Sequence, residues 1–166
     1  MPGRVRLLAI LLCVIIHLSG CATAPVSHKE PAAATIAVWD MEDLTPGAST
    51  HPDLGVVLSA KIIETIEKMD DYVVVERERL LLALEELNLG TTSLVEESTR
   101  LELGRLLQAR LMVFGGYQVI GNWMRLDLRL VHVETGKIVK AVQKTVSATN
   151  ATEWIAAAAE AATELI

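Results

Sequence analysis

Cysteine and aromatic residues are scarce in this chain of 166 residues. Its two cysteines are Cys13 and Cys21, so the sequence from residue 22 onward contains no thiol. That part of the chain therefore forms no disulfide, no thiolate metal site and no cysteine nucleophile. Three Trp, two Tyr and one Phe are too few for a surface on which bases or sugars would stack. A hydrophobic core alone must stabilise the fold.

Patterns typical of catalysis and metal binding are also missing. None of the four histidines has the His-x₃-His or Glu-x-x-His spacing that places two ligands on one helix face. Gly115-Gly116 is not followed by the Lys-Ser/Thr of a phosphate-binding loop, and the Gly-x-Ser-x-Gly pattern of a serine nucleophile is absent. We therefore expect a protein that is not an enzyme and that has no cofactor and no metal.

The charge balance excludes nucleic acid as a partner. The chain has 15 basic and 21 acidic residues, a formal net charge of −6, and its Lys and Arg residues do not cluster in the sequence. Binding to nucleic acid depends on neutralising phosphates with clustered basic residues.

The first 21 residues resemble the signal segment of a bacterial lipoprotein. Arg4 and Arg6 precede an apolar run over 7–16, and Leu18-Ser19-Gly20-Cys21 resembles a lipobox. A charged start, a short apolar run and small residues at a cleavage site are typical of a signal peptide, and the run is too short to span about 30 Å of hydrocarbon. This resemblance implies that residues 1–20 are removed and that Cys21 is lipidated. Because Ala22 is not Asp, it also implies an outer-membrane location on the periplasmic side.

Residues 21–34 are predicted to form a disordered tether after the lipidated cysteine, because they are rich in Ala, Pro, Ser and Thr. Residues 35–166 are predicted to form one domain. Apolar periodicity predicts helices over about 50–69, 76–87, 93–108 and 151–166 and strands over 35–41, 72–75, 111–120, 123–133 and 137–149.

The order β-α-β-α-α-β-β-β-α predicts an α/β (α+β) fold with a mixed sheet, a parallel βαβ start and an antiparallel meander. The β-branched run at 72–75 suggests an interior strand. In the helix over 76–87, leucines 80, 81, 84 and 87 form the expected inner face. In the strand over 123–133, Met124, Leu126, Leu128 and Leu130 alternate with Arg125, Asp127 and Arg129, which predicts one packed and one solvated face.

Several motifs resemble the curli assembly/transport (CsgG-type) family. They are Ile36-Ala37-Val38-Trp39-Asp40, the segments 72–80 and 85–89, Leu103 to Ala109, Val113 to Tyr117 and Val131 to Gly136. Flagellar outer-membrane lipoproteins, activators of penicillin-binding proteins and the N-terminal domain of the Tol periplasmic protein share this fold. Gln108 and Arg110 depart from the family's usual Gly and Asp. The chain has no room for the long hairpins of pore-forming members, so the resemblance implies the periplasmic fold without the channel.

An interaction edge is expected where the first two strands end. Glu42 and Asp43 follow the first strand, and Arg77 and Arg79 follow the second. The carboxyl ends of parallel strands lie at one edge of a sheet, where α/β folds place their sites. Arg77 and Arg79 also stand in the first turn of a helix, which the helix dipole disfavours. Two explanations remain open: an arginine pairs with Glu42 or Asp43 within the chain, or one reaches another chain.

The resemblance implies an outer-membrane-anchored lipoprotein that is an accessory or regulatory component of an envelope machine, such as curli-type secretion, the flagellum or the peptidoglycan-synthesis apparatus. Its partners would be the membrane, through the N-terminal lipid, and an envelope protein, with homo-oligomers possible. Two alternatives are a self-associating ring or scaffold and a periplasmic small-ligand sensor.

Overall fold

The computed structural model describes residues 33–47, 51–87, 96–147 and 151–166. The chain divides into two compact units, Met1–Pro31 and Ala32–Ile166, and every described residue belongs to the second. The elements of this unit are β1 (Ala34–Val38), β2 (Glu42–Asp43), α2 (Leu54–Ile66), β3 (Tyr72–Val74), α3 (Arg77–Glu86), α4 (Glu97–Leu106), β4 (Leu111–Ile120), β5 (Trp123–His132), β6 (Lys137–Ser147) and α5 (Ala151–Leu165).

The strands form one mixed sheet in the order β3-β1-β4-β5-β6, and β2 also pairs with β4. β1 is parallel to β3 and to β4, while β5 is antiparallel to both of its neighbours, β4 and β6. The predicted fold class, with a parallel start and an antiparallel meander, is confirmed. The turns of the meander contain Gly121 at φ +60° and Gly136 at φ +65°, the left-handed conformation that glycine adopts without strain.

Two predictions about the first strands are wrong. The expected strand over 35–41 is interrupted, because β1 ends at Val38 and a separate strand, β2, begins at Glu42. Ile36 pairs with Leu111 and Glu42 pairs with Gly116, so the segment from β1 to β2 has one residue more than the part of β4 that it pairs with. β3 is an edge strand of the sheet instead of an interior one, and its Val73 is 55% exposed. A β-branched run indicates a good fit to a pleated surface and does not specify the position of the strand in the sheet.

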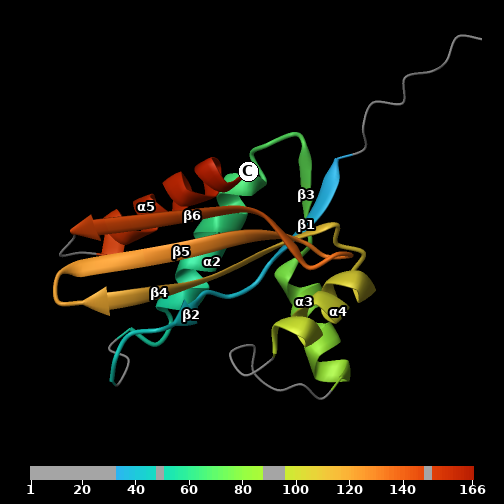
Figure 1. Cartoon of the computed structure of the whole chain (residues 1–166), viewed down its shortest axis with the longest axis horizontal. Coiled ribbons are helices and arrows are strands. Elements are labelled where there is room, and N and C mark those ends of the chain that lie inside the picture. The colour runs from blue at the N-terminus through green and yellow to red at the C-terminus, as the bar shows by residue number, and fades with distance from the viewer. Residues whose placement is uncertain (1–32, 48–50, 88–95, 148–150) are drawn as a thin grey trace, which may run out of the picture. The chain divides into compact units, whose positions relative to one another are not determined.

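Helices α2 and α5 cover one face of the sheet, as Figure 1 shows. The apolar sides of the two helices and of the meander form one core cluster, which includes Ile36, Leu58, Ile62, Leu126 and Leu128. Alanines of α5 permit close approach to α2; Ala157, Ala158, Ala161 and Ala162 are at most 2% exposed. Gly55 is required in α2 because a Cβ there would lie 2.2 Å from the carbonyl oxygen of Met41.

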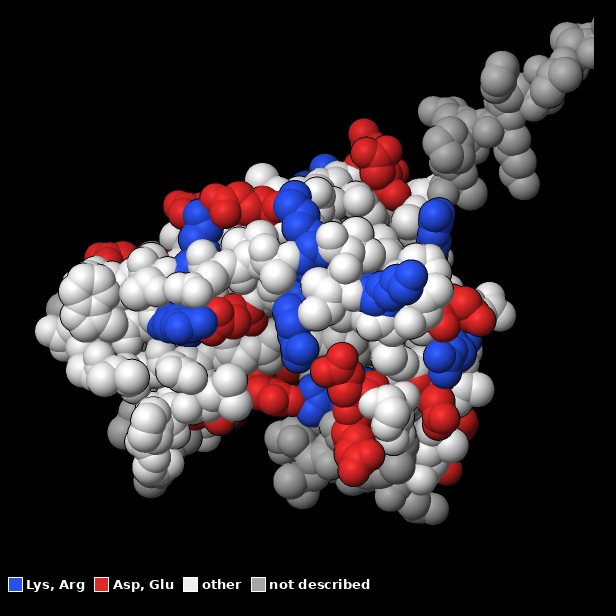
Figure 2. Space-filling model, viewed as in Figure 1, with Lys and Arg blue, Asp and Glu red and all other residues white. Residues whose placement is uncertain are grey.

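Helices α3 and α4 cover only part of the opposite face, near β1 and β3 (Figure 1). A second core cluster lies beneath them and contains Trp39, Leu80, Leu84, Leu103 and Phe114, among others. The rest of this face of the meander is solvated, and Arg125 and Arg129 are exposed there as predicted. Figure 2 shows basic and acidic side chains in close alternation, without a broad area of one sign on the face in view.

In the described part of the chain, no helix combines the length and apolar character needed to cross a membrane. The signal segment and Cys21 lie outside the described residues. So do Thr50 and Ser93, which begin two of the predicted helices, and Gly90, which follows the predicted helix over 76–87.

Candidate functional site

An ion pair between Asp40 and Arg77 joins β1 to the start of α3. Arg77 donates to both carboxylate oxygens of Asp40, from Nε at 3.2 Å and from Nη2 at 2.6 Å. The hydroxyl of Ser59, a fully buried residue of α2, lies 3.0 Å from the same carboxylate. The hydrogen bonds from Arg77 to Asp40 raise the pKa of the guanidinium. The carboxylate of Asp40 therefore links α2 and α3 to the segment after β1, and Arg77 has a structural role.

A second ion pair joins β2 to α4. Arg100 pairs with Glu42, and its guanidinium carbon lies 5.2 Å from the centre of the Trp39 ring, a cation–π arrangement. The expected partners were therefore wrong: Arg77 pairs with Asp40 instead of Glu42 or Asp43, and the partner of Glu42 is Arg100. The reason is that the first strand ends at Val38, which leaves Asp40 in the connection between β1 and β2.

Asp43 and Arg79 have different surroundings. Asp43 accepts a hydrogen bond from the backbone N–H of Thr45 at 2.9 Å and stabilises the turn after β2. Arg79 is exposed on α3, and no carboxylate of the described residues lies within ion-pair distance of it. Of the four predicted edge residues, Arg77 and Glu42 thus form ion pairs within the chain. Arg79 has no such pair among the described residues, so its guanidinium is available to another molecule.

Arg79 lines an apolar groove between α3 and α4. We call it the α3–α4 groove; it has a volume of about 470 Å³ and is lined by Arg79, Leu82, Ala83, Glu86, Leu87, Leu106 and Leu107. Leu82 is 58% exposed, Leu87 47% and Leu106 64%. Arg79 and Glu86 add one charge of each sign to a lining of aliphatic side chains. Such a surface can bind an apolar segment and orient it by charge.

Sequence reasoning missed this groove because it assigned leucines 80, 81, 84 and 87 to a single inner face. The structure buries Leu80 and Leu84, at 4% and 2% exposure, and leaves Leu81 and Leu87 at 38% and 47%. The signal was present as an excess: the ten-residue helix has four leucines, at 80, 81, 82 and 84, and Leu87 follows it, which is more than one buried stripe needs.

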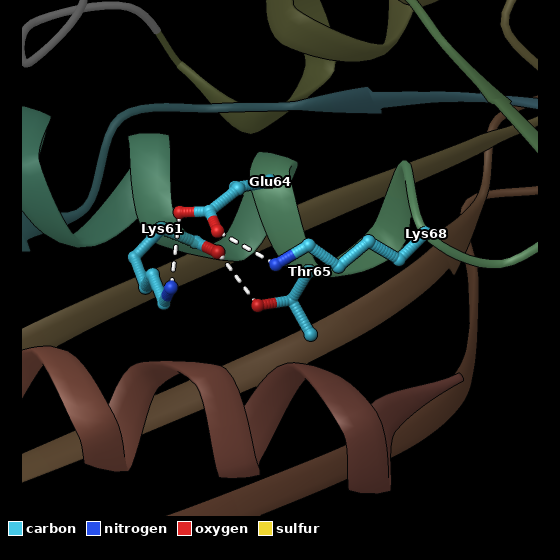
Figure 3. A network of polar contacts seen from close by, with 4 residues as sticks. All are labelled: Lys61, Glu64, Thr65 and Lys68. Carbon is cyan, nitrogen blue, oxygen red and sulfur yellow. Dashed lines mark hydrogen bonds and ion pairs between the residues drawn. The ribbon is translucent and has the colours of Figure 1, made fainter.

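A network of charges on α2 has no features of a site. Glu64 lies between Lys61, at 2.9 Å, and Lys68, at 2.7 Å (Figure 3). Hydrogen bonds from the two lysines, that of Lys68 foremost, lower the pKa of Glu64 to about 2. These residues lie on successive turns and stabilise the solvated side of the helix. Within the described residues, no group of three or more His, Cys, Asp or Glu side chains could hold a metal ion.

Comparison with known proteins identifies a family and a fold. The model of the family "Curli production assembly/transport component CsgG" matches residues 25–121. No curated protein matches the chain. Among solved structures, the LpoB C-terminal domain from Salmonella enterica aligns with a TM-score of 0.59 at 18% identity, covering 72% of this chain and 87% of that one.

Two further structures have the same fold. The lipoprotein GNA1162 from Neisseria meningitidis aligns with a TM-score of 0.60 at 12% identity and covers 70% of this chain and 83% of its own. The PelC dodecamer from Paraburkholderia phytofirmans aligns with a TM-score of 0.52 at 14% identity and covers 80% of this chain and 87% of its own. At these identities the likeness concerns the fold alone.

Proposed function

This chain belongs to the family of the curli production assembly/transport component CsgG, and from that premise we propose that it is a non-catalytic accessory component of an envelope machine. It is anchored in the outer membrane through a lipid on Cys21 and binds a protein partner in the α3–α4 groove. The observation that carries the proposal is the exposure of Leu82, Leu87 and Leu106 around one groove.

The chemistry of the groove indicates an amphipathic protein segment as its occupant. Covering three leucines that are about half exposed would contribute roughly 1 kcal/mol or more each. Arg79 and Glu86 both line the groove, so an acidic residue and a basic residue on the segment would fix its direction. Apolar anchors with oriented rim charges are the features that give protein interfaces affinity and register.

The anchor follows from the lipobox-like Leu18-Ser19-Gly20-Cys21. Acyl chains each contribute about 0.8 kcal/mol per buried methylene, and more than one chain is enough for stable attachment. The residues from Ala22 to the start of β1 at Ala34 extend at most about 40 Å, which would keep the domain close to its membrane.

Fractionation of Cys21→Ala tests the anchor. We expect the variant to fold and to leave the membrane fraction, or to accumulate unprocessed, whereas Cys13→Ala should be processed and retained like the natural chain. Membrane retention of a processed Cys21→Ala chain would show that another anchor exists.

Charge reversal of Arg79 tests the groove. Arg79 is exposed and has no described ion pair, so Arg79→Glu should leave the melting temperature unchanged and abolish chemical crosslinking to the partner in cells. The control is Arg125→Glu, an exposed arginine of β5 whose ion-pair partner, Asp127, is also on β5, which should leave crosslinking intact. If Arg79→Glu melts normally and crosslinks normally, Arg79 has no part in the function.

Self-association into a ring or scaffold is the second candidate. The relative PelC crystallised as a dodecamer, and β6 presents an edge of 11 residues with Ile138 and Val139 more than half exposed. Three lysines and a bulge opposite Leu130/Val131 are devices that discourage edge-to-edge pairing, so we rank this candidate second. Sedimentation of the purified chain distinguishes the two, because a monomer with a crosslinked partner supports docking and a closed oligomer supports the scaffold.

A further inference from the structure

A second concave site lies at the opposite end of α4 from its first turn. It has a volume of about 340 Å³ and includes Arg105, Gln108, Arg110, His132 and Glu134 in its lining. These residues come from the end of α4, the start of β4 and the turn after β5. No residue lines both this pocket and the α3–α4 groove, although Leu106 and Leu107 of the groove lie between Arg105 and Gln108 in the chain. The inference below does not rest on the proposed docking function.

The two arginines of this pocket are available to a ligand. Both are exposed, and neither lies within 4 Å of a carboxylate of the described residues. Arg105 makes one marginal contact, from Nη2 to the carbonyl oxygen of Val133 at 3.5 Å. A guanidinium presents a planar fork of N–H donors that matches a carboxylate or a phosphate.

The backbone under the arginines is fixed. The N–H of Arg110 donates to the carbonyl of Thr35 at 2.8 Å, and the carbonyl of Arg110 accepts from the N–H of Val133 at 3.0 Å. The backbone of Arg110 is therefore tied to β1 on one side and to the turn after β5 on the other. A binding group on a fixed backbone loses less entropy when a ligand binds.

Gln108 occupies a conformation that glycine normally occupies. Its φ is +57°, the one positive φ of a described non-glycine residue. Bonds from the N–H of Ala109 to the carbonyl of Gly104 and from Gln108 to Arg105 form the Schellman motif, which usually ends in glycine. The strained residue places an amide side chain in the lining of the pocket, and such strain tends to occur at binding sites.

His132 and Glu134 complete the polar lining. His132 lines the pocket with the rest of its ring, while its Nδ1 atom is buried and has no hydrogen-bond partner among the described residues. Glu134 contributes a carboxylate beside the two guanidinium groups. The pocket thus has two cations for an anionic group and one anion for a cationic group.

We propose that this pocket binds a small zwitterion that has both a carboxylate and an ammonium group, such as an amino acid or the free end of a short peptide. The arginines take the carboxylate and Glu134 takes the ammonium. A phosphate dianion has no cation to offer Glu134 and would be repelled by it. The volume is at the lower end of the range found for small-molecule sites, which suits a ligand of one to three residues.

Calorimetric titration of the full chain in detergent tests the proposal with three probes: alanyl-alanine, N-acetyl-alanyl-alanine and inorganic phosphate. We expect alanyl-alanine to bind, the acetylated peptide to bind about tenfold more weakly because it lacks the ammonium, and phosphate to bind more weakly still. Absence of alanyl-alanine binding at 10 millimolar, on the order of the weakest useful affinity, overturns the proposal, as does phosphate binding equal to that of alanyl-alanine.

Two variants assign the roles. Arg110→Gln should weaken alanyl-alanine binding about tenfold or more, while Arg125→Gln, which makes the same change of charge on exposed β5, should leave it unchanged. Glu134→Gln should remove the preference for the free amine over the acetylated peptide. Both pocket residues are exposed, so melting temperatures should not change. Equal binding by Arg110→Gln and Arg125→Gln would place the ligand elsewhere and overturn the proposal.

Discussion

The two faces of the sheet differ in how completely helices cover them. The face under α2 and α5 is continuous: its cluster extends from β1 to the end of α5 and includes 19 buried residues. The face under α3 and α4 has a smaller cluster of 12, and helical leucines beside it remain exposed. The contrast is one of degree: Val56 and Val57 of α2 are each 41% exposed, whereas Leu82 and Leu106 beside the second cluster are 58% and 64% exposed.

The difference separates stability from recognition. Contacts between α2, α5 and the meander determine whether the domain folds, since most of the buried apolar surface is there. The α3–α4 face is attached through two ion pairs, Arg77 with Asp40 and Arg100 with Glu42, which fix the helices by charge while their outer leucines remain accessible. A surface of this kind can be altered with little effect on folding.

Truncating a leucine on each face gives the largest contrast. Leu58→Ala removes a fully buried side chain of α2 and should lower the free energy of unfolding by about 2–5 kcal/mol through lost burial and a residual cavity. Leu82→Ala, at 58% exposure, should change it by less than about 0.5 kcal/mol. Urea unfolding of both variants measures the contrast, and equal losses would show that the α3–α4 face is part of the main core.

The ion pair at the end of β1 should have an intermediate effect. Arg77→Gln leaves Asp40, whose side chain is 17% exposed, without its charged partner, and we expect a loss of about 1–2 kcal/mol. The control is Arg125→Gln, which breaks the exposed pair with Asp127 and should cost less than about 0.5 kcal/mol. Equal and small losses would mean that α3 is held in place by apolar contacts alone.

Gln108→Gly should stabilise the domain. Glycine removes the strain of a positive φ but loses more conformational entropy on folding, so the net gain should be about 0.5–1 kcal/mol. The control Gln143→Gly, in exposed β6, gains nothing in conformation and should cost about 0.5–1 kcal/mol. Thermal unfolding of the pair would contradict the conformational argument if both variants lost stability.

The smallest expected effect is the pH dependence of α2. Glu64 has its pKa lowered to about 2 by the two lysines, so its folded pKa is below its unfolded one. Its contribution is therefore fully present above the ordinary glutamate pKa and is lost as the pH falls toward 2. Because the Glu64 side chain is 53% exposed and solvent screens its charge, the effect should be small. The measurement is the difference in melting temperature between the natural chain and the Glu64→Gln variant. This difference should shrink as the pH falls from 5 to 2, about the range of the folded and unfolded pKa values. A difference that stays constant would contradict the assigned cause.

The sequence was informative where one physical signal dominates. Alternation in β5, with Leu126 and Leu128 buried between exposed arginines, predicted the packed face of the meander. It failed where long-range pairing decides. The β-branched run of β3 does not show which strands will be its neighbours, and in the sheet it pairs with β1 alone. The extra residue between β1 and β2 changed the partner of Arg77. The α3–α4 groove was missed because periodicity does not show how much of a helix a short companion helix can cover.

The central claim is that the α3–α4 groove is the surface on which an envelope protein docks. The most direct measurement is in-cell photo-crosslinking from a photoreactive amino acid at Leu106, which is 64% exposed in the groove, against the same amino acid at Ala156, which is exposed on α5. The account predicts a discrete adduct with a second protein from position 106, lost on Arg79→Glu, and no such adduct from position 156. Adducts of equal yield from both positions, or an adduct from position 156 alone, would contradict it.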